Sequence, residues 1–446
     1  MIYLKNLTEG NIYKNFILFA FPVVLSGVMS QAFGVINSAI AGTYLGELGR
    51  AATGCTAGFI SFISSLLWGY CTGVGLKTAI LFGARDSESL KKSFWSNISF
   101  VSLACIIISL LCVTFKNQIF TFLKVDPTVR EQAELYYLIY VSTLILYIIN
   151  VFFVKFFQAL GVSAYPFKVS TVTTAFGIVL RILSIVMLGM GVEGIAIAAA
   201  VSALAANLLY FKKAFSCFRE LGCESVKPEF DVHEIKSTFR LSMPSSLQQG
   251  VMYVATFLIS PTVNALGKSA TAAYSVALQT YEINAAIYQN SAITVSSYTA
   301  QCVGAKKYEN LKKGVRVGFL QGIIFLVPVL LATVIFAKPL CSLFFEKGFV
   351  GESFDLALLF VRSFLPFVFF NVINNLFHNF FRGVKAVNLV LLFTALASVV
   401  RIISTLALAP VHGMIGVYTG WVISWIFEAV IISLAYFLGV WKKYLK

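Results

Sequence analysis

The chain has 446 residues, of which 59% are hydrophobic and 12% are charged, and its mean hydropathy is +0.85. Soluble proteins carry about 25% charged and about 45–50% apolar residues, so this composition excludes a soluble enzyme, a disordered regulator and a secreted disulfide scaffold. It predicts an all-α polytopic membrane protein. The net charge of +15 would suggest a nucleic-acid partner for a soluble chain. In membrane proteins basic residues gather in cytoplasmic loops, and we expect no nucleic acid here.

Twelve segments are long and apolar enough to be transmembrane helices, each of which needs about 20 mostly apolar residues to cross a bilayer. Six lie in the first half of the chain and six in the second. In chain order the predicted spans are 15–36, 54–82, 94–115, 135–160, 167–189, 192–211, 239–263, 271–303, 315–336, 357–381, 387–408 and 414–438.

The positions of Lys and Arg predict the orientation. If both termini are cytoplasmic, the inner segments carry about three times as many of these residues as the outer loops, which is the bias that membrane proteins show. The longest polar stretch runs from about residue 212 to 240 and is predicted to be a cytoplasmic linker. It separates an N-terminal six-helix lobe, residues 1–222, from a C-terminal six-helix lobe, residues 223–446.

The two halves repeat in sequence. The segment GARDSESLKK at 83–92, after the second span, matches GAKKYENLKK at 304–313, after the eighth, in six of ten positions. Because six helices return the chain to the same side of the membrane, the lobes are expected to be pseudo-symmetric parallel repeats. Further matching positions are Pro22 with Pro244 and Arg181 with Arg401.

Parallel repeats related by an axis along the membrane normal are an architecture of transporters. The sequence therefore predicts a substrate cavity between the lobes and alternating access by rocking of one lobe against the other. Because one lobe interface already builds such a cavity, we expect a monomer.

Polar side chains are costly within a bilayer, so each one in a predicted span is a functional candidate, with helix–helix hydrogen bonding as the alternative. The fourth span carries Tyr147, Asn150 and Gln158 at helical spacing. We interpret these three side chains as candidates for the lining of the substrate cavity.

The seventh and eighth spans add Tyr253, Gln279 and Gln289 to the cavity candidates. The eighth span also contains Glu282, which with Glu428 is one of two acids deep within any span. A carboxylate there could exchange a proton or bind Na⁺, or it could pair structurally with a basic residue. Both interpretations stay open for Glu282, whereas Glu428 is interpreted as mostly structural.

The tenth span has a polar stripe. Its members follow helical spacing and occupy one face, and a polar face cannot be directed toward lipid. This pattern favours the lining of a cavity or an ion site. The members are Asn371, Asn374, Asn375, His378 and Arg382.

The sequence lacks the motifs of common enzyme classes. It has no P-loop lysine motif and no G-x-S-x-G, its three histidines are dispersed, and none of its eight cysteines forms a CxxC pair. We therefore expect no enzymatic activity, no bound metal and no cofactor, and cysteines that serve as small core residues.

Several short segments are typical of one transporter family: GVG at 73–75, GARD at 83–86, FQALG at 157–161 and QCVGA at 301–305. With the twelve spans and the duplicated halves, they resemble the multidrug and toxic compound extrusion (MATE) family over nearly the whole chain. The resemblance implies a secondary active antiporter that exports amphipathic, often cationic, organic compounds in exchange for H⁺ or Na⁺.

The sequence departs from that family in its first half. Members commonly carry an aspartate in the first helix, where this chain has Asn37, and often another in the fifth helix, where this chain has Arg181 and no acid. The resemblance therefore implies an N-lobe cation site that is lost or altered, and coupling through Glu282 in the C-lobe. The ion-coupling candidates are Glu282, Asn37, Asn371, Asn374 and His378.

Two alternatives remain. A lipid-linked oligosaccharide flippase of the same superfamily would need a basic cavity for a pyrophosphate, and Arg362→Ala should then abolish its activity. A non-transporting membrane sensor could have lost its coupling acids. The antiporter is the favoured interpretation, located in the plasma membrane (the inner membrane of a bacterium), with a small organic substrate and membrane lipid as its partners.

Overall fold

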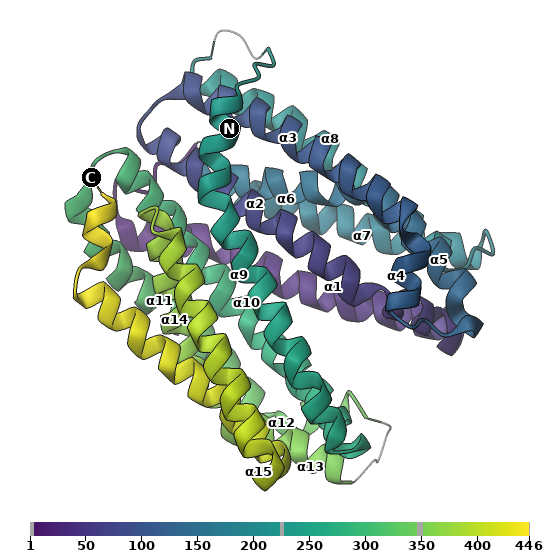
Figure 1. Cartoon of the computed structure of the whole chain (residues 1–446). Helices are drawn as coiled ribbons and strands as arrows, with labels where there is room; N and C mark the ends of the chain where they lie inside the picture. Colours follow the sequence, from purple (N-terminus) through teal and green to yellow (C-terminus); the bar gives the residue numbers. More distant parts are fainter. Residues whose placement is uncertain (1–3, 224–226, 346–350, 446) are drawn as a thin grey trace. The chain divides into compact units, whose positions relative to one another are not determined.

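The computed structural model describes residues 4–223, 227–345 and 351–445, which form helices joined by short loops, with no strand among them (Figure 1). The predicted all-α fold is confirmed. The helices of the first half are α1 (Ile12–Cys55), α2 (Ala57–Gly83), α3 (Ser87–Thr114), α4 (Lys116–Phe122), α5 (Pro127–Ser142), α6 (Leu144–Ala159), α7 (Ala164–Val186) and α8 (Val192–Glu220). Those of the second half are α9 (Val232–Ala265), α10 (Lys268–Gly304), η1 (Tyr308–Asn310), α11 (Leu311–Ile335), α12 (Ala337–Ser342), α13 (Glu352–Leu359), η2 (Phe360–Phe364), η3 (Leu365–Val368), α14 (Phe369–Gly383), α15 (Val387–Phe437) and η4 (Val440–Tyr444).

All twelve predicted spans are helical, but helix boundaries and spans do not correspond one to one. The last two spans form the two helical parts of α15, which are separated by non-helical backbone at Gly413, with a left-handed φ of 58°. The fourth span is divided between α5 and α6, which are bent by 46°. The tenth span runs from α13 through the π-helical turn η2 and the 3₁₀ turn η3 into α14.

By length and composition, eight helices of the described chain can cross a membrane, or up to nine if α5 and α6 form one span. The surfaces of these helices fit a lipid environment. On α7 the large side chains of Val172, Phe176, Val179 and Leu183 follow helical spacing and are all at least 40% exposed. Such a continuous apolar stripe would be unfavourable in water, and the chain is a multi-pass membrane protein.

The described chain divides into two compact units, which share two helices. The first unit contains Met29–Ser246 together with the start of the chain up to Asn6; the second contains Leu7–Val28 and the chain from Leu247 onward. The first part of α1 therefore belongs to the second unit, and the first part of α9 belongs to the first. This division differs from a single cut at residue 222.

Aromatic side chains fill the core of the first unit. The ring of Phe94 lies 4.8 Å from that of Phe156 and 5.1 Å from that of Phe218, and all three are essentially inaccessible. Each such ring removes a large apolar area from its surroundings. These contacts join α3, α6 and α8 into one bundle.

The second unit has an aromatic core of its own. Phe360 of the π-helical turn packs edge-on against Trp421, with ring centroids 5.6 Å apart, and Trp421 lies 5.9 Å from Trp425. Phe16, from the first part of α1, packs against Tyr298 of α10 at 5.1 Å. The short helices α12 and α13 lie together at one end of this unit (Figure 1).

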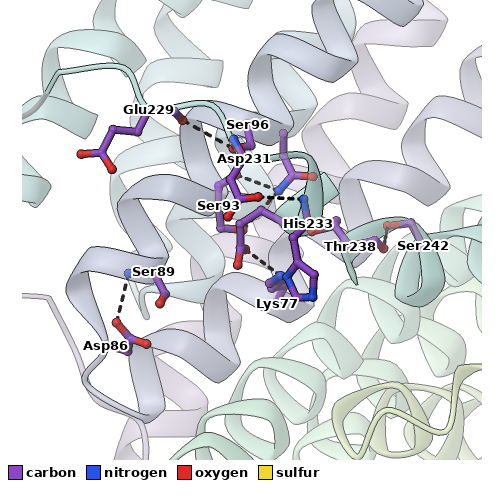
Figure 2. Close-up of polar contacts among 12 residues, drawn as sticks. Lys77, Asp86, Ser89, Ser93, Ser96, Glu229, Asp231, His233, Thr238 and Ser242 are labelled. Atoms are coloured by element: carbon purple, nitrogen blue, oxygen red, sulfur yellow. Dashed lines mark hydrogen bonds and ion pairs between the residues drawn. The ribbon is translucent and has the colours of Figure 1, made fainter. Parts of the chain in front are cut away.

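The segment predicted to be a linker, 212–240, contains the end of α8 and the start of α9, and its residues 224–226 lie outside the described residues. The residues just before α9 contact α3. Figure 2 shows the backbone N–H of Asp231 directed at Ser96, whose Oγ accepts this hydrogen bond at 2.8 Å. The Asp231 carboxylate in turn accepts a hydrogen bond from the N–H of His233 at 2.8 Å. Asp231 therefore caps the first turn of α9.

Ion pairs hold the same segment to the first unit. Lys77 Nζ on α2 lies 2.6 Å from Glu234 Oε2 on α9, and both side chains are at least 85% buried (Figure 2). Lys91 Nζ on α3 lies 2.8 Å from the Glu229 carboxylate and 2.9 Å from that of Glu88. The start of α9 is thus held on α2 by a buried ion pair, and the residues just before α9 are held on α3 by a partly exposed one.

Small residues allow α2 and α9 to approach closely. A Cβ built on Gly73 would lie 1.9 Å from Ser242 Oγ, and one on Gly69 would lie 2.4 Å from Ser246 Cα. The two serine hydroxyls donate hydrogen bonds to backbone carbonyls of α2, at 3.1 Å and 2.7 Å. This is the small-residue packing typical of helices in membranes.

Candidate functional site

The polar stripe predicted for the tenth span lies on α14 and is buried inside the second unit. Asn371, Asn374 and His378 are each at most 7% exposed. The amide of Asn374 donates hydrogen bonds to Asn371 Oδ1 at 3.2 Å and to the carbonyl oxygen of Trp425 at 3.1 Å. The stripe therefore faces protein rather than lipid.

His378 is paired with an acid of α15. Its Nε2 lies 3.1 Å from Glu428 Oε1, and the two side chains are 9% and 11% exposed. The same carboxylate oxygen accepts a hydrogen bond from Thr394 Oγ1 at 3.4 Å. A buried carboxylate is costly unless it is paired, and the imidazole of His378 supplies that partner.

The pair continues into a chain of hydrogen bonds that reaches α9. Gln248 donates to Thr394 Oγ1 at 2.8 Å through Nε2, and its Oε1 accepts a hydrogen bond from Arg382 Nη2. Three helices contribute to this chain, which we call the second-unit network. Its members are Gln248, His378, Arg382, Thr394 and Glu428.

Several polar atoms in this region are buried without a hydrogen-bond partner. They include Asn371 Nδ2, Asn374 Oδ1 and Arg382 Nε. A buried polar atom left unpaired costs about 1–3 kcal/mol. These atoms are therefore available to a ligand, an ion or water inside the second unit.

Glu282, in contrast, lies on the surface of the second unit. The side chains of Gln279, Glu282 and Gln289 are exposed on α10 at helical spacing. Tyr253 of α9 is 44% exposed and close enough to Glu282 for the two to interact electrostatically. Because a charged face cannot be directed toward lipid at low cost, this face suits contact with water or a polar substrate.

Tyr281 lies between the exposed face and the buried network. Its ring stacks on that of Trp425, with centroids 5.5 Å apart and an angle of 11°. Its hydroxyl lies 2.8 Å from that of Tyr288. Tyr281 also interacts electrostatically with Glu282 beside it and with Glu428 of the second-unit network.

In the first unit, Asn37 is bound to an arginine. Arg181 Nη1 on α7 donates a hydrogen bond to Asn37 Oδ1 on α1 at 2.7 Å, and the arginine is only 8% exposed. Its repeat mate in the second unit, Arg401, lies instead over the ring of Trp421, 4.4 Å from the centroid. The two arginines therefore have different partners.

Of the candidates in the fourth span, Tyr147 lies nearest to this arginine. It interacts electrostatically with Arg181, and its ring stacks on that of Tyr140 at 4.7 Å. Gln158 is buried near the end of α6, and Asn150 is half-buried. The predicted site residues thus form three groups: the α14 stripe, the exposed α10 face with Tyr253, and the Asn37 region of the first unit.

Sequence reasoning missed three members of the second-unit network. Glu428 was interpreted as mostly structural, and Gln248 and Thr394 gave no signal because each is a single polar residue without periodic partners. The scarcity of titratable groups could have pointed to the pair. His378 is the one histidine in the stripe, and Glu428 is one of two acids deep in the spans.

The described residues contain no group of three His, Cys, Asp or Glu side chains that could hold a metal ion. The eight cysteines are free, and seven of them are buried, as expected for small core residues.

The chain matches the family model described as MatE twice, over residues 22–183 and 244–406. The two matches begin at Pro22 and Pro244, which the sequence repeat had already aligned. This result confirms the duplication of the chain. Together the two matched stretches cover well over half of the sequence.

Individual proteins show the same relationship. The chain is 24% identical to the probable multidrug resistance protein YoeA of Bacillus subtilis over 353 residues, which cover 76% of this chain and 75% of the relative. Its fold is similar to that of a D→N mutant of the Vibrio cholerae MATE transporter VcmN, with a TM-score of 0.88, 18% identity and coverage of 97% and 98%. It is equally similar, with a TM-score of 0.88, 18% identity and 96% coverage of both chains, to a MOP superfamily transporter from Pyrococcus furiosus described as having a binding pocket of reverse polarity.

Proposed function

Because the chain belongs to the MatE family of membrane transporters, we propose that it is a secondary active antiporter that exports amphipathic organic compounds in exchange for H⁺ or Na⁺. The relatives named as multidrug resistance proteins support an organic substrate. The proposal places the protein in the plasma membrane as a monomer with both termini in the cytoplasm, in contact with lipid and without a cofactor or nucleic-acid partner.

The observation that carries the proposal is the buried pair of His378 and Glu428, whose Nε2 and Oε1 atoms lie 3.1 Å apart. The hydrogen bonds through Thr394 and Gln248 connect the pair to a third helix. Gain of a proton by the pair would change the hydrogen bonds that hold α9, α14 and α15 together. This chemistry favours H⁺ over Na⁺ as the coupling ion.

Two other groups act on the pair. Arg382 reaches it through Gln248 from the same helix as His378, and Tyr281 on α10 interacts electrostatically with Glu428. We propose that substrate on the exposed α10 face and a proton on the pair compete through Tyr281, which interacts electrostatically with both regions.

Glu282 stays a coupling candidate alongside the pair. Its exposed carboxylate suits binding of an organic cation, whereas the buried pair suits storage of a proton. The two roles predict different defects in transport. Loss of substrate binding raises the substrate concentration needed for half-maximal flux, whereas loss of coupling removes the dependence of the flux on the ion gradient.

The test is uptake of ethidium, a fluorescent organic cation, into proteoliposomes with an imposed pH gradient or Na⁺ gradient in separate runs. We expect ethidium flux to follow the pH gradient. The flux should fall to the level of protein-free liposomes in Glu428→Gln and in His378→Gln. In Glu282→Gln the half-saturating ethidium concentration should rise. Glu352→Gln, an equivalent change on an exposed side chain of α13, is the control and should behave as wild type.

Other outcomes would correct the proposal. Flux that follows only the Na⁺ gradient would exclude the proton pair. Flux lost from Glu282→Gln under the pH gradient, but retained in Glu428→Gln and His378→Gln, would assign coupling to Glu282. No flux from well-folded protein under either gradient would refute antiport.

One observation keeps the lipid-linked oligosaccharide flippase as a second candidate. Arg362 is exposed on the π-helical turn η2, where a cation could bind a pyrophosphate, and a transporter of similar fold is described as having a reversed pocket polarity. Arg362→Ala should then abolish flipping of a pyrophosphate-linked lipid analogue in vesicles without affecting ethidium flux.

A further inference from the structure

Arg181 is a buried cation in the first unit whose hydrogen-bonded partner is an amide rather than a carboxylate. It is 8% exposed, and its Nη1 donates to Asn37 Oδ1 at 2.7 Å. None of the ion pairs found among the described residues includes it. Burying a charge without an opposite charge is costly, so this position requires a reason beyond helix packing.

Two buried hydrogen-bond donors lie at this position. Arg181 Nε is buried and has no hydrogen-bond partner, and the hydroxyl of Tyr147 is buried with only the side chain of Thr143 in hydrogen-bonding reach, one turn earlier in the chain. The phenol and the guanidinium interact electrostatically, so they lie in the same region. A positive charge with buried N–H and O–H donors is the requirement of an oxyanion, since arginine binds carboxylate and phosphate groups with two parallel hydrogen bonds.

Aromatic rings lie beside these donors. The ring of Tyr140 lies between those of Tyr136 and Tyr147. Its centroid is 6.2 Å from that of Tyr136 and 4.7 Å from that of Tyr147, and the rings of Tyr140 and Tyr147 are nearly parallel, at 14°. All three rings are half-buried, so part of each is accessible. Tyr136 also interacts electrostatically with Arg181. Helices α1, α5, α6 and α7 thus bring a cation, an amide and three phenols together.

We propose that Arg181, Asn37, Tyr136, Tyr140 and Tyr147 bind an amphipathic aromatic molecule through its oxyanion, a carboxylate or a phosphate. The guanidinium and the Tyr147 hydroxyl hold the anionic group, and the tyrosine rings contact the apolar body. As a substrate site this inference rests on the proposed transport function, and it extends the substrates to organic anions. It departs from the often cationic compounds that the sequence resemblance implies.

The test is equilibrium binding of three probes that share one ring system and differ in charge: 2-naphthoate, neutral 2-naphthamide and cationic 2-naphthylmethylammonium. Binding to the purified full-length protein in detergent is measured by calorimetry without any ion gradient. We expect the wild type to prefer 2-naphthoate over the amide by roughly tenfold or more, which is the size of a charge-assisted hydrogen bond.

Three variants assign that preference. Arg181→Gln should abolish it. Asn37→Asp should also abolish it, because a carboxylate at the Asn37 position would neutralise the guanidinium; this variant adds an ion pair and should keep the thermal stability of the wild type. Arg401→Gln, at the repeat mate in the second unit, is the matched control and should leave the preference for 2-naphthoate unchanged.

The results are decisive in either direction. Equal affinity of the wild type for the three probes, lack of 2-naphthoate binding, or an anion preference that survives Asn37→Asp would each overturn the inference and leave Arg181 as a link between α1 and α7. Because binding is measured without a gradient, its failure is distinct from a failure of ion-driven flux in the proteoliposome experiment.

Discussion

A single methyl group at Gly73 should weaken the first unit measurably. The new Cβ would lie 1.9 Å from Ser242 Oγ and 2.7 Å from Ser242 Cα. The hydroxyl can rotate away, but the Cα belongs to the backbone of α9, so the two helices must separate by several tenths of an ångström. The hydrogen bond from Ser242 to the carbonyl of Tyr70, at 3.1 Å, would then be stretched or broken.

The expected cost follows from these contacts. Overpacking of a tightly packed site costs about 1–3 kcal/mol, and an interhelical hydrogen bond in a membrane contributes about 0.6 kcal/mol. For a unit of this size, a loss of 1 kcal/mol lowers the midpoint of thermal unfolding by about 2–4 °C. Gly73→Ala should therefore lower the midpoint by about 2–12 °C.

The buried cysteines supply the assay. Seven of the eight cysteines are buried, and one of them, Cys71, lies two residues from Gly73. A thiol-reactive fluorescent maleimide therefore reports unfolding of the protein, as labelling above that of the half-buried Cys55, when the purified protein is heated in detergent. Gly58→Ala is the control, because a Cβ at Gly58, in the same helix, meets no atom within 4 Å. It should leave the midpoint within about 1 °C of wild type.

A second change tests the contact itself. Ser242→Gly removes the Oγ and Cβ atoms that the new methyl group would strike, while the Cα at 2.7 Å remains. It should restore part of the midpoint lost in Gly73→Ala. An unchanged midpoint in Gly73→Ala, an equal loss in Gly58→Ala, or no recovery in the double variant would refute the reasoning.

Two further predictions concern the charges that fix the start of α9. Lys77→Met should lower the free energy of unfolding by about 3–5 kcal/mol, because it leaves the Glu234 carboxylate buried without its partner. Adding Glu234→Gln should recover part of the lost thermal midpoint. A Lys77→Met variant as stable as wild type would exclude a structural role for the pair. A hydrogen bond from Lys91 holds the pKa of Glu229 below its ordinary value of 4.5. The ionised carboxylate therefore stabilises the folded protein fully above pH 4.5. This stabilisation is lost as the pH falls from 4.5 through the lower pKa of the folded state. The difference in midpoint between wild type and Glu229→Gln should accordingly be constant at neutral pH and disappear in acid, and a difference that persists in acid would contradict the assignment.

Hydropathy was sufficient to predict the helices, because the need to satisfy every backbone group inside a bilayer leaves few alternatives to a helix. It did not predict where every span bends. The predicted break between the spans at 387–408 and 414–438 is confirmed by the non-helical backbone at Gly413, whereas the fourth span, 135–160, is divided between two helices bent by 46°. Hydropathy also treated α9 as a simple span, whereas its first turns are held by Lys77 and Ser96 in the first unit.

Periodicity predicted the candidate site only where polar residues repeat within one helix. The α14 stripe has such a repeat, and its burial follows from it. The partners of that stripe come from other helices: Glu428 lies 50 positions after His378 in the sequence, and no local pattern connects the two. The contact between Asn37 and Arg181 spans 144 positions. The sequence shows that each residue departs from the family pattern, but it does not show the hydrogen bond between them.

The shared helices bear on how the chain arose. The segment Leu7–Val28 contains Pro22, and the part of α9 that belongs to the first unit contains its repeat mate Pro244. Equivalent segments of the two repeats are therefore exchanged, each completing the unit built from the other half. Each compact unit of the present chain therefore draws on both repeats. Reciprocal exchange is the arrangement of a domain-swapped homodimer, and the present chain is what fusion of two such subunits into one gene would produce.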